Sequence, residues 1–254
     1  MPDPHLHNFS IHLLTALAKP ILPGGYWAKN ARRQILPHDD QSATTGSGAD
    51  SRGKSTSGRA AGPKVNPNDN LTVNLTYDDG PNPLTTPGLV KLLDEEGIKA
   101  TFFFIGQNIE KYPELVELVF KSGHTVANHS YSHPFMPGLS RARMAAEIDK
   151  TNALIEAITG HKTHLFRPPY GIIDGRGAKL LEERRMSPVY WGAVTEDWRN
   201  IGADAVVKHI MKRLPTAQLI VMHEGHDIAD QCLSATGTII GRVKDAGYHF
   251  AAIK

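Results

Sequence analysis

Hydrophobic and polar residues alternate in the segment that leads to an aspartate pair. In residues 71–77 (LTVNLTY), every apolar or aromatic residue before Tyr77 is followed by Thr or Asn. A period of two is typical of a strand with one buried face, so we predict a strand that ends at Asp78. The apolar residues of 89–93 (LVKLL) recur at helical spacing, and Gly97 supplies a stop. The segment therefore predicts a strand followed by a helix.

This alternation continues to the end of the chain. A helix is predicted from the N-cap Ser140 to Gly160. The other predicted strands are 100–105, 124–127, 164–166, 189–192, 219–222 and 248–253, and the other helices are 113–122, 177–185, 204–214 and 234–246. Strands and helices alternate about seven times, which is typical of a parallel sheet. In one domain of this size the pattern predicts an α/β fold with a barrel of about seven parallel strands.

The N-terminal part has a different composition. Residues 41–62 contain no Val, Ile, Leu, Met or aromatic residue, so they bury too little apolar surface to offset their ordering entropy. Residues 9–22 are largely apolar, but Lys19 and Pro20 interrupt them and no Lys or Arg precedes them, which favours a loosely docked arm over a secretory signal. We therefore divide the chain into an arm (1–40), a flexible linker (41–68) and a folded domain (69–254).

Composition excludes several classes of protein. Lys and Arg number 28 against 26 Asp and Glu, and no basic stripe is visible, which argues against nucleic acid as a partner. A single cysteine, Cys232, excludes an internal disulfide framework and a cysteine-based zinc site, and it is expected to be a small core residue. No apolar stretch reaches the roughly 18 residues that span a bilayer, so we expect no transmembrane segment. We expect a monomer.

Ionisable residues follow nearly every predicted strand, and in a parallel barrel the functional groups lie at these strand ends. The sequences at these ends are TYDDGP (76–81), NHSYSHP (128–134), RPPYG (167–171), EDW (196–198) and MHE (222–224). Taken alone, Asp-Asp-Gly-Pro is a good turn sequence. The four-residue spacing of His129 and His133 would aim both imidazoles at one point if the segment formed a helical turn.

Together, the aspartate pair and the two histidines indicate more than either motif does alone. Two neutral imidazoles and one carboxylate leave open positions on a divalent cation, which is the arrangement of catalytic zinc sites. A second carboxylate beside the cation can accept a proton from water instead of binding the ion. The aspartate pair and the two histidines therefore predict a metal-dependent hydrolytic site.

The motifs TYDDGP, HSYSH, RPPYG, EDW and LIVMH, in this order, resemble the five motifs of the polysaccharide deacetylases, carbohydrate esterase family four. The resemblance covers about residues 71–254 and implies the irregular barrel of the NodB-homology domain. It implies a hydrolase that removes acetyl groups from N-acetylglucosamine-containing polysaccharide, such as peptidoglycan or chitin-like chains, and releases acetate.

The resemblance also implies the role of each motif residue. Asp78 resembles the catalytic base, and Asp79, His129 and His133 resemble the ligands of a divalent metal, with zinc expected and cobalt or another ion as alternatives. Arg167 resembles the residue that holds the base, His223 the general acid, and Asp197, at the end of the fourth motif, a further catalytic residue. The resemblance also implies that Tyr170 offers a backbone N–H to the oxyanion, that Trp198 forms a wall, and that Leu219 or a neighbour shapes the pocket for the acetyl methyl group.

One position departs from the family pattern. The fourth motif begins with an aspartate three residues before the Asp-Trp pair, and this chain has Val194 there. In the family that aspartate supports the catalytic histidine. We therefore predict that the pKa of His223 lies close to or below its ordinary value of about 6.5, unless Glu196 or Glu224 supplies the carboxylate.

His226, three residues past His223, could line the site. The other histidines of the domain are expected to be packing or surface residues: His124, His161, His164, His209 and His249.

Other functions remain open at this point. The same residues would serve an acetylxylan O-acetyl esterase or a hydrolase of a small cyclic amide, and Val194 also fits a carbohydrate-binding relative with weakened catalysis. Acetate release from N-acetylglucosamine oligomers, with and without a chelator, separates these readings. The location is open too, because the resemblance implies a secreted or cell-envelope protein, whereas the sequence alone favours the cytoplasm.

Overall fold

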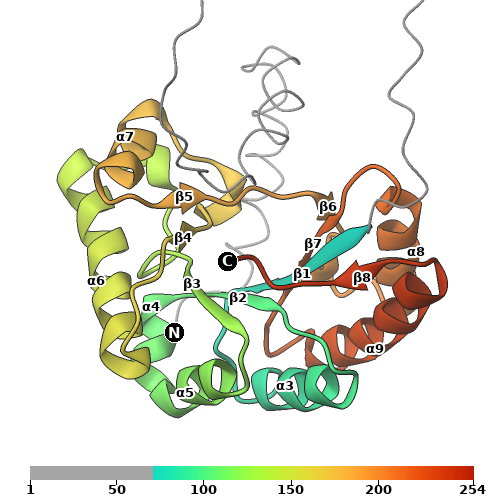
Figure 1. Cartoon of the computed structure of the whole chain (residues 1–254). Coiled ribbons are helices and arrows are strands. Elements are labelled where there is room, and N and C mark those ends of the chain that lie inside the picture. The colour runs from blue at the N-terminus through green and yellow to red at the C-terminus, as the bar shows by residue number, and fades with distance from the viewer. Residues whose placement is uncertain (1–70) are drawn as a thin grey trace, which may run out of the picture. The chain divides into compact units, whose positions relative to one another are not determined.

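A curled parallel sheet carries the fold in the part of the chain that a computed structural model describes, residues 71–254. The strands lie side by side in the order β5-β4-β3-β2-β1-β7-β6, and β8 pairs with β1 off this path (Figure 1). All of these pairs are parallel. With helices along its outside, the sheet forms a half-barrel, so the predicted α/β barrel fold is confirmed. The predicted arm and linker lie outside the described residues.

The elements have the following bounds. The strands are β1 (Thr72–Asp78), β2 (Thr101–Phe104), β3 (Thr125–Asn128), β4 (Leu165–Phe166), β5 (Ser187–Pro188), β6 (Ala193–Val194), β7 (Leu219–His223) and β8 (His249–Phe250). The helices are α3 (Thr86–Glu95), α4 (Gly106–Lys111), α5 (Pro113–Lys121), α6 (Arg141–Thr159), α7 (Gly175–Glu183), α8 (Ala203–Arg213) and α9 (Ala229–Asp245), with 3-10 turns η1 (Met136–Gly138), η2 (Pro169–Gly171) and η3 (Asp197–Arg199).

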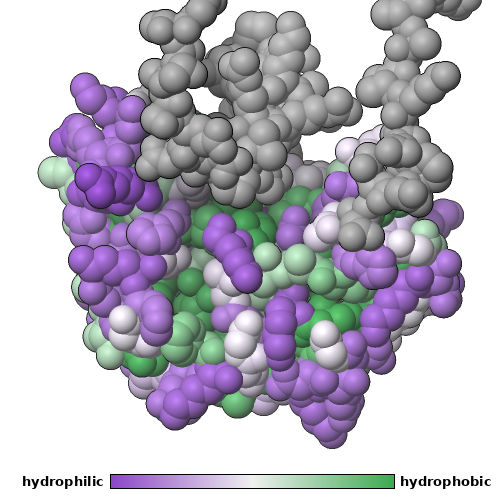
Figure 2. Space-filling model, viewed as in Figure 1, coloured by the Kyte–Doolittle hydropathy of each residue, from purple (hydrophilic) through white to green (hydrophobic). Residues whose placement is uncertain are grey.

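The main core lies where β1, β2 and β7 meet the helices. Val73, Leu75 and Tyr77 of β1 are fully buried, and Cys232 of α9 belongs to the same core cluster, as predicted. In the view of Figure 1, hydrophilic side chains dominate the outer margin formed by the helices, and apolar ones show between them (Figure 2). Among residues 71–254, none of the helices combines the length and the apolar character needed to cross a bilayer.

The signals for the start and end of α6 act as predicted. The Ser140 hydroxyl accepts a hydrogen bond from the backbone N–H of Arg143, and Gly160 ends the helix in the left-handed conformation with φ of 73°. This pair of signals is the usual one for a helix that begins at Ser and ends at Gly. The helix is therefore defined by its caps as well as by its buried residues.

The predicted strand at 189–192 is wrong. The chain forms two short strands instead, β5 before this segment and β6 after it. Pro188 cannot donate a ladder hydrogen bond. A Cβ at Gly192 would lie 2.4 Å from the carbonyl oxygen of Leu219, so the backbones come too close there for a side chain. Helix α4 was not predicted, because in its six residues only Gly106 and Ile109 are buried, too few to show a period.

Candidate active site

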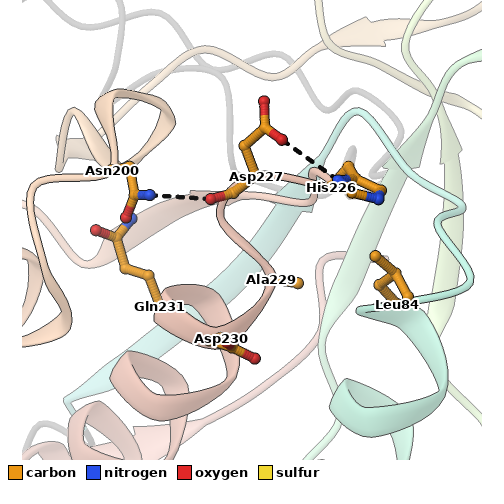
Figure 3. Close-up of a pocket in the computed structure, with 7 residues that line it drawn as sticks. All are labelled: Leu84, Asn200, His226, Asp227, Ala229, Asp230 and Gln231. Atoms are coloured by element: carbon orange, nitrogen blue, oxygen red, sulfur yellow. Dashed lines mark hydrogen bonds and ion pairs between the residues drawn. The ribbon is translucent and has the colours of Figure 1, made fainter.

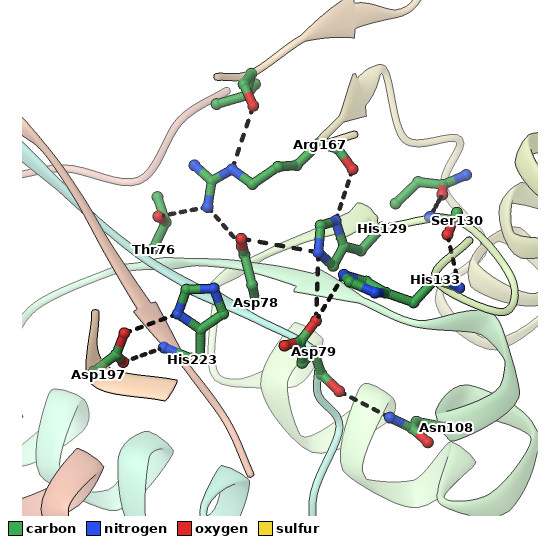
Figure 4. A network of polar contacts seen from close by, with 12 residues as sticks. Thr76, Asp78, Asp79, Asn108, His129, Ser130, His133, Arg167, Asp197 and His223 are labelled. Carbon is green, nitrogen blue, oxygen red and sulfur yellow. Dashed lines mark hydrogen bonds and ion pairs between the residues drawn. The ribbon is translucent and has the colours of Figure 1, made fainter. Parts of the chain in front are cut away.

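The strand register brings the base and acid candidates together. Asp78, the last residue of β1, is the register partner of His223, the last residue of β7. The register also pairs β2 with β3 at Phe104 and Asn128, so the loops that follow these strands start from one edge of the sheet. Figure 4 shows the side chains of these loops converging. The predicted cluster at the strand ends therefore exists in the fold.

Asp79, His129 and His133 form a compact group, which we call the metal triad. Asp79 Oδ1 lies 3.4 Å from Nε2 of each histidine, and all three ligand atoms lie within 4.8 Å of one another. Ligand atoms on a tetrahedral zinc with bonds of about 2.0–2.1 Å lie about 3.3 Å apart. Asp79 Oδ1 is buried and has no hydrogen-bond partner. The spacing and the unpaired oxygen therefore fit a bound cation.

The hydrogen bond of His129 and the pKa of His133 both suit metal binding. His129 Nδ1 lies 2.7 Å from the carbonyl oxygen of Arg167, so this nitrogen donates and Nε2 presents its lone pair to the triad. Burial lowers the pKa of His133 to about 4, which keeps its imidazole neutral at pH 7. Burial opposes ionisation of Asp79, but His133 and His129 nevertheless hold the pKa of this carboxyl well below its usual value. Neutral imidazoles and a carboxylate are the forms that bind metals.

The loop 129–133 brings His129 and His133 together without forming the helical turn that was considered from sequence. It is not a helical turn: Ser130 and His133 have positive φ angles of 67° and 54°. Asn128 Oδ1 accepts from the Ser130 N–H at 2.7 Å, and Ser130 Oγ accepts from the His133 N–H at 3.1 Å. Glu147 of α6 accepts two further backbone N–H groups of the loop, at 2.9 and 2.8 Å. Side-chain hydrogen bonds therefore aim the imidazoles.

Asp78 is held on one oxygen only. Arg167 Nη1 donates to Asp78 Oδ1 at 2.6 Å and to Thr76 Oγ1 at 2.8 Å, and neither charged side chain is exposed. The guanidinium lies 4.0 Å above the ring of Phe103. Asp78 Oδ2 has no hydrogen-bond partner and lies 3.9 Å from His129 Nε2. A fixed carboxylate with one free oxygen beside the triad is suited to accept a proton.

His223 has a carboxylate partner, although Val194 replaces the aspartate of the family motif. Asp197 Oδ1 lies 2.9 Å from His223 Nδ1, and Asp197 Oδ2 accepts the His223 backbone N–H at 2.7 Å. Burial alone would lower the pKa of His223, but the charge and hydrogen bond of Asp197 raise it to about 9. The prediction of a pKa near or below 6.5 is therefore wrong, because Asp197 itself supports the imidazole.

Neither glutamate considered for this role supplies it. Glu196 is exposed, and its carboxylate pairs with Arg199 at 3.0 Å. Glu224 is buried, and its carboxylate accepts hydrogen bonds from Thr85 and Thr86. Burial raises the pKa of Glu224 to about 7. The sequence did contain the correct carboxylate, in the Asp-Trp pair itself.

Aromatic rings lie beside the acid candidate His223 and beside His133 of the metal triad. The ring of Trp198 lies 5.1 Å from that of His223, and the ring of Tyr170, a residue with φ of 58°, lies 4.8 Å from that of His133. Trp191 was missed from sequence. Its ring lies 6.0 Å from Trp198 and 6.3 Å from His223. Its position just after Val189 and Tyr190 made it look like part of a strand, although the segment is irregular.

Leu219 does not reach the site, so its predicted role in the acetyl pocket is wrong. It is the first residue of β7 and the register partner of Asn74. Strands rise about 3.3 Å per residue, which puts Leu219 about 13 Å along the strand from His223. Val221 lies on the same face, two residues before His223, and is fully buried.

A pocket of about 410 Å³ opens among the loops that follow β1, η3 and β7 (Figure 3). His226, whose place was left open from sequence, lines this pocket and is not part of the metal triad; the other lining residues are Leu84, Asn200, Asp227, Ala229, Asp230 and Gln231. Asn200 donates to the carbonyl oxygen of Asp227 at 3.0 Å, which joins two of the loops. Of the remaining histidines, His124 is buried and accepts the Ala100 N–H at 3.2 Å, as expected for a packing residue.

Comparisons with known proteins show which family the chain resembles. The polysaccharide deacetylase family profile matches residues 65–188. A peptidoglycan-N-acetylglucosamine deacetylase of Bacillus cereus is 31% identical over 190 residues, which cover 74% of this chain and 68% of that protein. Chitin deacetylase 1 of Cryptococcus neoformans is 36% identical over 136 residues, 54% of this chain and 29% of that protein. The crystal structure of a peptidoglycan N-acetylglucosamine deacetylase in complex with 4-naphthalen-1-yl-N-oxidanyl-benzamide superposes with a TM-score of 0.70 at 30% identity, covering 73% of this chain and 87% of that chain.

Proposed function

The chain belongs to the polysaccharide deacetylase family, and on this basis we propose that it is a metal-dependent hydrolase that removes acetyl groups from N-acetylglucosamine-containing polysaccharide. The observation that supports this most directly is the arrangement around Asp78. Its unpaired oxygen Oδ2 lies beside the metal triad, and its register partner on the neighbouring strand β7 is His223. A base, a cation site and an acid therefore surround one point.

The metal triad supplies two nitrogens and one oxygen. Three protein ligands leave open positions for water and substrate, and this donor set suits zinc, with cobalt or another divalent ion as alternatives. A divalent cation held there would lower the pKa of bound water and polarise the acetamide carbonyl. Asp79 and His133 contribute by being deprotonated before the cation binds, and His129 contributes through the hydrogen bond that orients its ring.

Asp78 takes the proton of the attacking water on Oδ2, while Arg167 holds Oδ1. Transfer of this proton makes the water oxygen nucleophilic as it bonds to the acetyl carbon. The carbonyl oxygen then gains negative charge, and we assign the backbone N–H of Tyr170 as one donor to it. Loss of a single oxyanion donor typically costs about 100- to 1,000-fold in rate.

His223 completes the reaction. Its Nδ1 is bonded to Asp197, so Nε2 is the nitrogen that donates a proton to the sugar nitrogen as the C–N bond breaks. The products are acetate and a free amino sugar. An amine leaves readily only when it is protonated, and a pKa of about 9 keeps the imidazolium available at neutral pH.

The position of the acid also orients the glycan. The leaving nitrogen belongs to the sugar, so the sugar ring lies on the His223 side of the cation. The pocket of Figure 3 begins three residues beyond His223, at His226. We assign this pocket to sugar units next to the reacting one, with Leu84 available for an apolar face of a ring. If the polymer is peptidoglycan, the protein acts in the cell envelope or after secretion, which cell fractionation would test.

Acetate release from a panel of substrates tests the proposal. The panel contains N-acetylglucosamine oligomers, peptidoglycan and acetylxylan, each with and without a chelator. We expect release from an N-acetyl substrate, its loss on chelation, and its recovery on adding zinc or cobalt. His161→Ala, which changes an exposed histidine outside the metal triad, serves as the control for His133→Ala. Full activity of the metal-stripped protein, or activity on acetylxylan alone, would contradict the proposal.

A further inference from the structure

Glu224 is a buried carboxylate that the acid–base chemistry does not use. It follows His223 directly, and only 4% of its surface is exposed. Its backbone N–H donates to the carbonyl oxygen of Asp78 at 2.9 Å. Its Oε2 accepts the Thr85 hydroxyl at 2.6 Å and also the Thr86 hydroxyl, whereas Oε1 has no partner. The side chain therefore reaches away from His223, toward the loop that joins β1 to α3.

This loop is organised around the carboxylate at the expense of its own helix. Thr85 is the N-cap residue of α3, but its hydroxyl donates to Glu224 and makes no cap hydrogen bond. A threonine at this position ordinarily stabilises the helix that it begins. The Thr86 hydroxyl donates to Glu224 and accepts the Asn82 N–H at 2.8 Å. Two threonine side chains at the start of α3 thus donate to one carboxylate that directly follows β7.

The carboxylate also packs directly on the backbone beside Asp79. A Cβ at Gly80 would lie 2.0 Å from Glu224 Oε1 and 2.8 Å from the ring of Phe104. The Gly80 carbonyl oxygen accepts the N–H of Ile105 at 2.9 Å. Gly80 therefore fits only because it has no side chain, and Glu224 fills the space that one would take.

We propose that Glu224 is a positioning residue that fixes the loop 79–86 against the end of β7. The proposal rests on the proposed function, because it concerns the separation of the base Asp78 from the acid His223. Both groups act on one substrate, and a displacement of about 1 Å can cost about 100-fold in rate. Glu224 links the segments on which the two groups lie, through its backbone to Asp78 and through its side chain to the loop beyond Asp79.

Three variants of the full chain test the positioning role of Glu224: Glu224→Ala, Glu224→Gln and Thr86→Val. Glu182→Ala, at an exposed position in α7, is the matched control. The measurements are hydrogen exchange of the backbone amides of residues 79–86, and kcat and KM for acetate release. Exchange needs no turnover, so it reports on the loop even if the proposed function is wrong.

We expect Glu224→Ala to speed exchange at Asn82 and to lower kcat per folded molecule about 10- to 100-fold, with KM nearly unchanged. Glu224→Gln keeps an oxygen for the two threonine hydroxyls, so it should retain most of the exchange protection and of kcat. Thr86→Val removes one of the two hydroxyl donors, and its effect should fall between those of the two Glu224 variants. Glu182→Ala should match the wild type.

Three outcomes would overturn the proposal. The first is a Glu224→Ala protein with normal exchange at 79–86 and normal kcat. The second is a Glu224→Gln protein as impaired as Glu224→Ala, which would assign the effect to the charge and not to the hydrogen bonds. The third is a loss of activity that only follows the folded fraction, with kcat per folded molecule unchanged. If Glu224→Ala does not fold, Thr86→Val and Glu224→Gln carry the test with the same measurements.

Discussion

Replacing Asp197 with asparagine removes one negative charge from the partner of His223 and changes the volume very little. Asp197 accepts two hydrogen-bonding groups of His223, its backbone N–H and its Nδ1. Asparagine has one acceptor oxygen, so it keeps at most one of these bonds. The charge that stabilises the imidazolium is lost in either case, and we expect the acid to fail at neutral pH.

The size of the effect follows from the surroundings of His223. Burial is the largest influence on its pKa and lowers it, and the carboxylate of Asp197 offsets this and raises the value to about 9. Without that charge the pKa should fall below the ordinary value of about 6.5. At pH 7.5 the imidazolium fraction then drops from about 97% to about 10% or less, which lowers kcat at least about 10-fold. A cation at Asp79 would lower both pKa values, because the Asp79 and Asp78 charges help to raise them, but their difference would remain.

The sign of the pH dependence is fixed by the role of His223. An acid works while it is protonated, so activity is lost as the pH rises through its pKa. The assay is the pH–rate profile of acetate release between about pH 5.5 and 10. In this profile, Asp197→Asn should shift the basic limb to lower pH. Glu196→Gln is the matched control, since it removes a neighbouring exposed carboxylate that pairs with Arg199. A basic limb that does not move in Asp197→Asn, or that moves equally in the control, would refute the assignment of His223 as the acid.

Three further results are expected. His133→Ala should abolish metal binding and activity together without unfolding the domain, as measured by metal content and circular dichroism; retained metal would contradict the triad. Asp78→Asn should keep its metal but lose turnover, because an amide cannot accept the proton, whereas Asp79→Asn should raise the metal dissociation constant; similar behaviour of the two variants would show that base and ligand are misassigned. Gly80→Ala places a Cβ 2.0 Å from Glu224 and should destabilise the domain by about 1–3 kcal/mol in thermal unfolding, whereas Gly175→Ala, which meets nothing within 4 Å, should not; equal effects would contradict the packing of Gly80.

Local patterns predicted the elements that carry the site. The alternation of residues 71–77 predicts β1, and Ser140 and Gly160 predict both ends of α6, because each signal acts within a few residues. The clustering of Asp78, Asp79, His129, His133 and Arg167 was also predictable, since parallel strands end at one edge. Wherever period, cap or strand direction decides the structure, the sequence is sufficient.

Contacts that depend on register or on an unusual turn were not predictable. Leu219 looked close to His223 in the motif, but its place at the start of β7 removes it from the site. The contact of Asp197 with His223 depends on a turn in which Glu196 adopts φ of 59°, a conformation that its residue type does not signal. Trp191 lies in a segment whose aromatic and apolar residues indicate a strand, and only the irregular backbone there reveals its place beside Trp198.

The reactivity of the Cys232 thiol can report on opening motions of the domain. It is the chain's one cysteine, it is fully buried in the core cluster with Tyr77 and Leu89, and burial raises the pKa of its thiol well above the usual value. A thiol reagent needs both access and a thiolate, so it can modify the protein only when α9 separates from its neighbours. The rate of labelling in native buffer therefore measures how often the layer behind β1 opens, without any engineered probe.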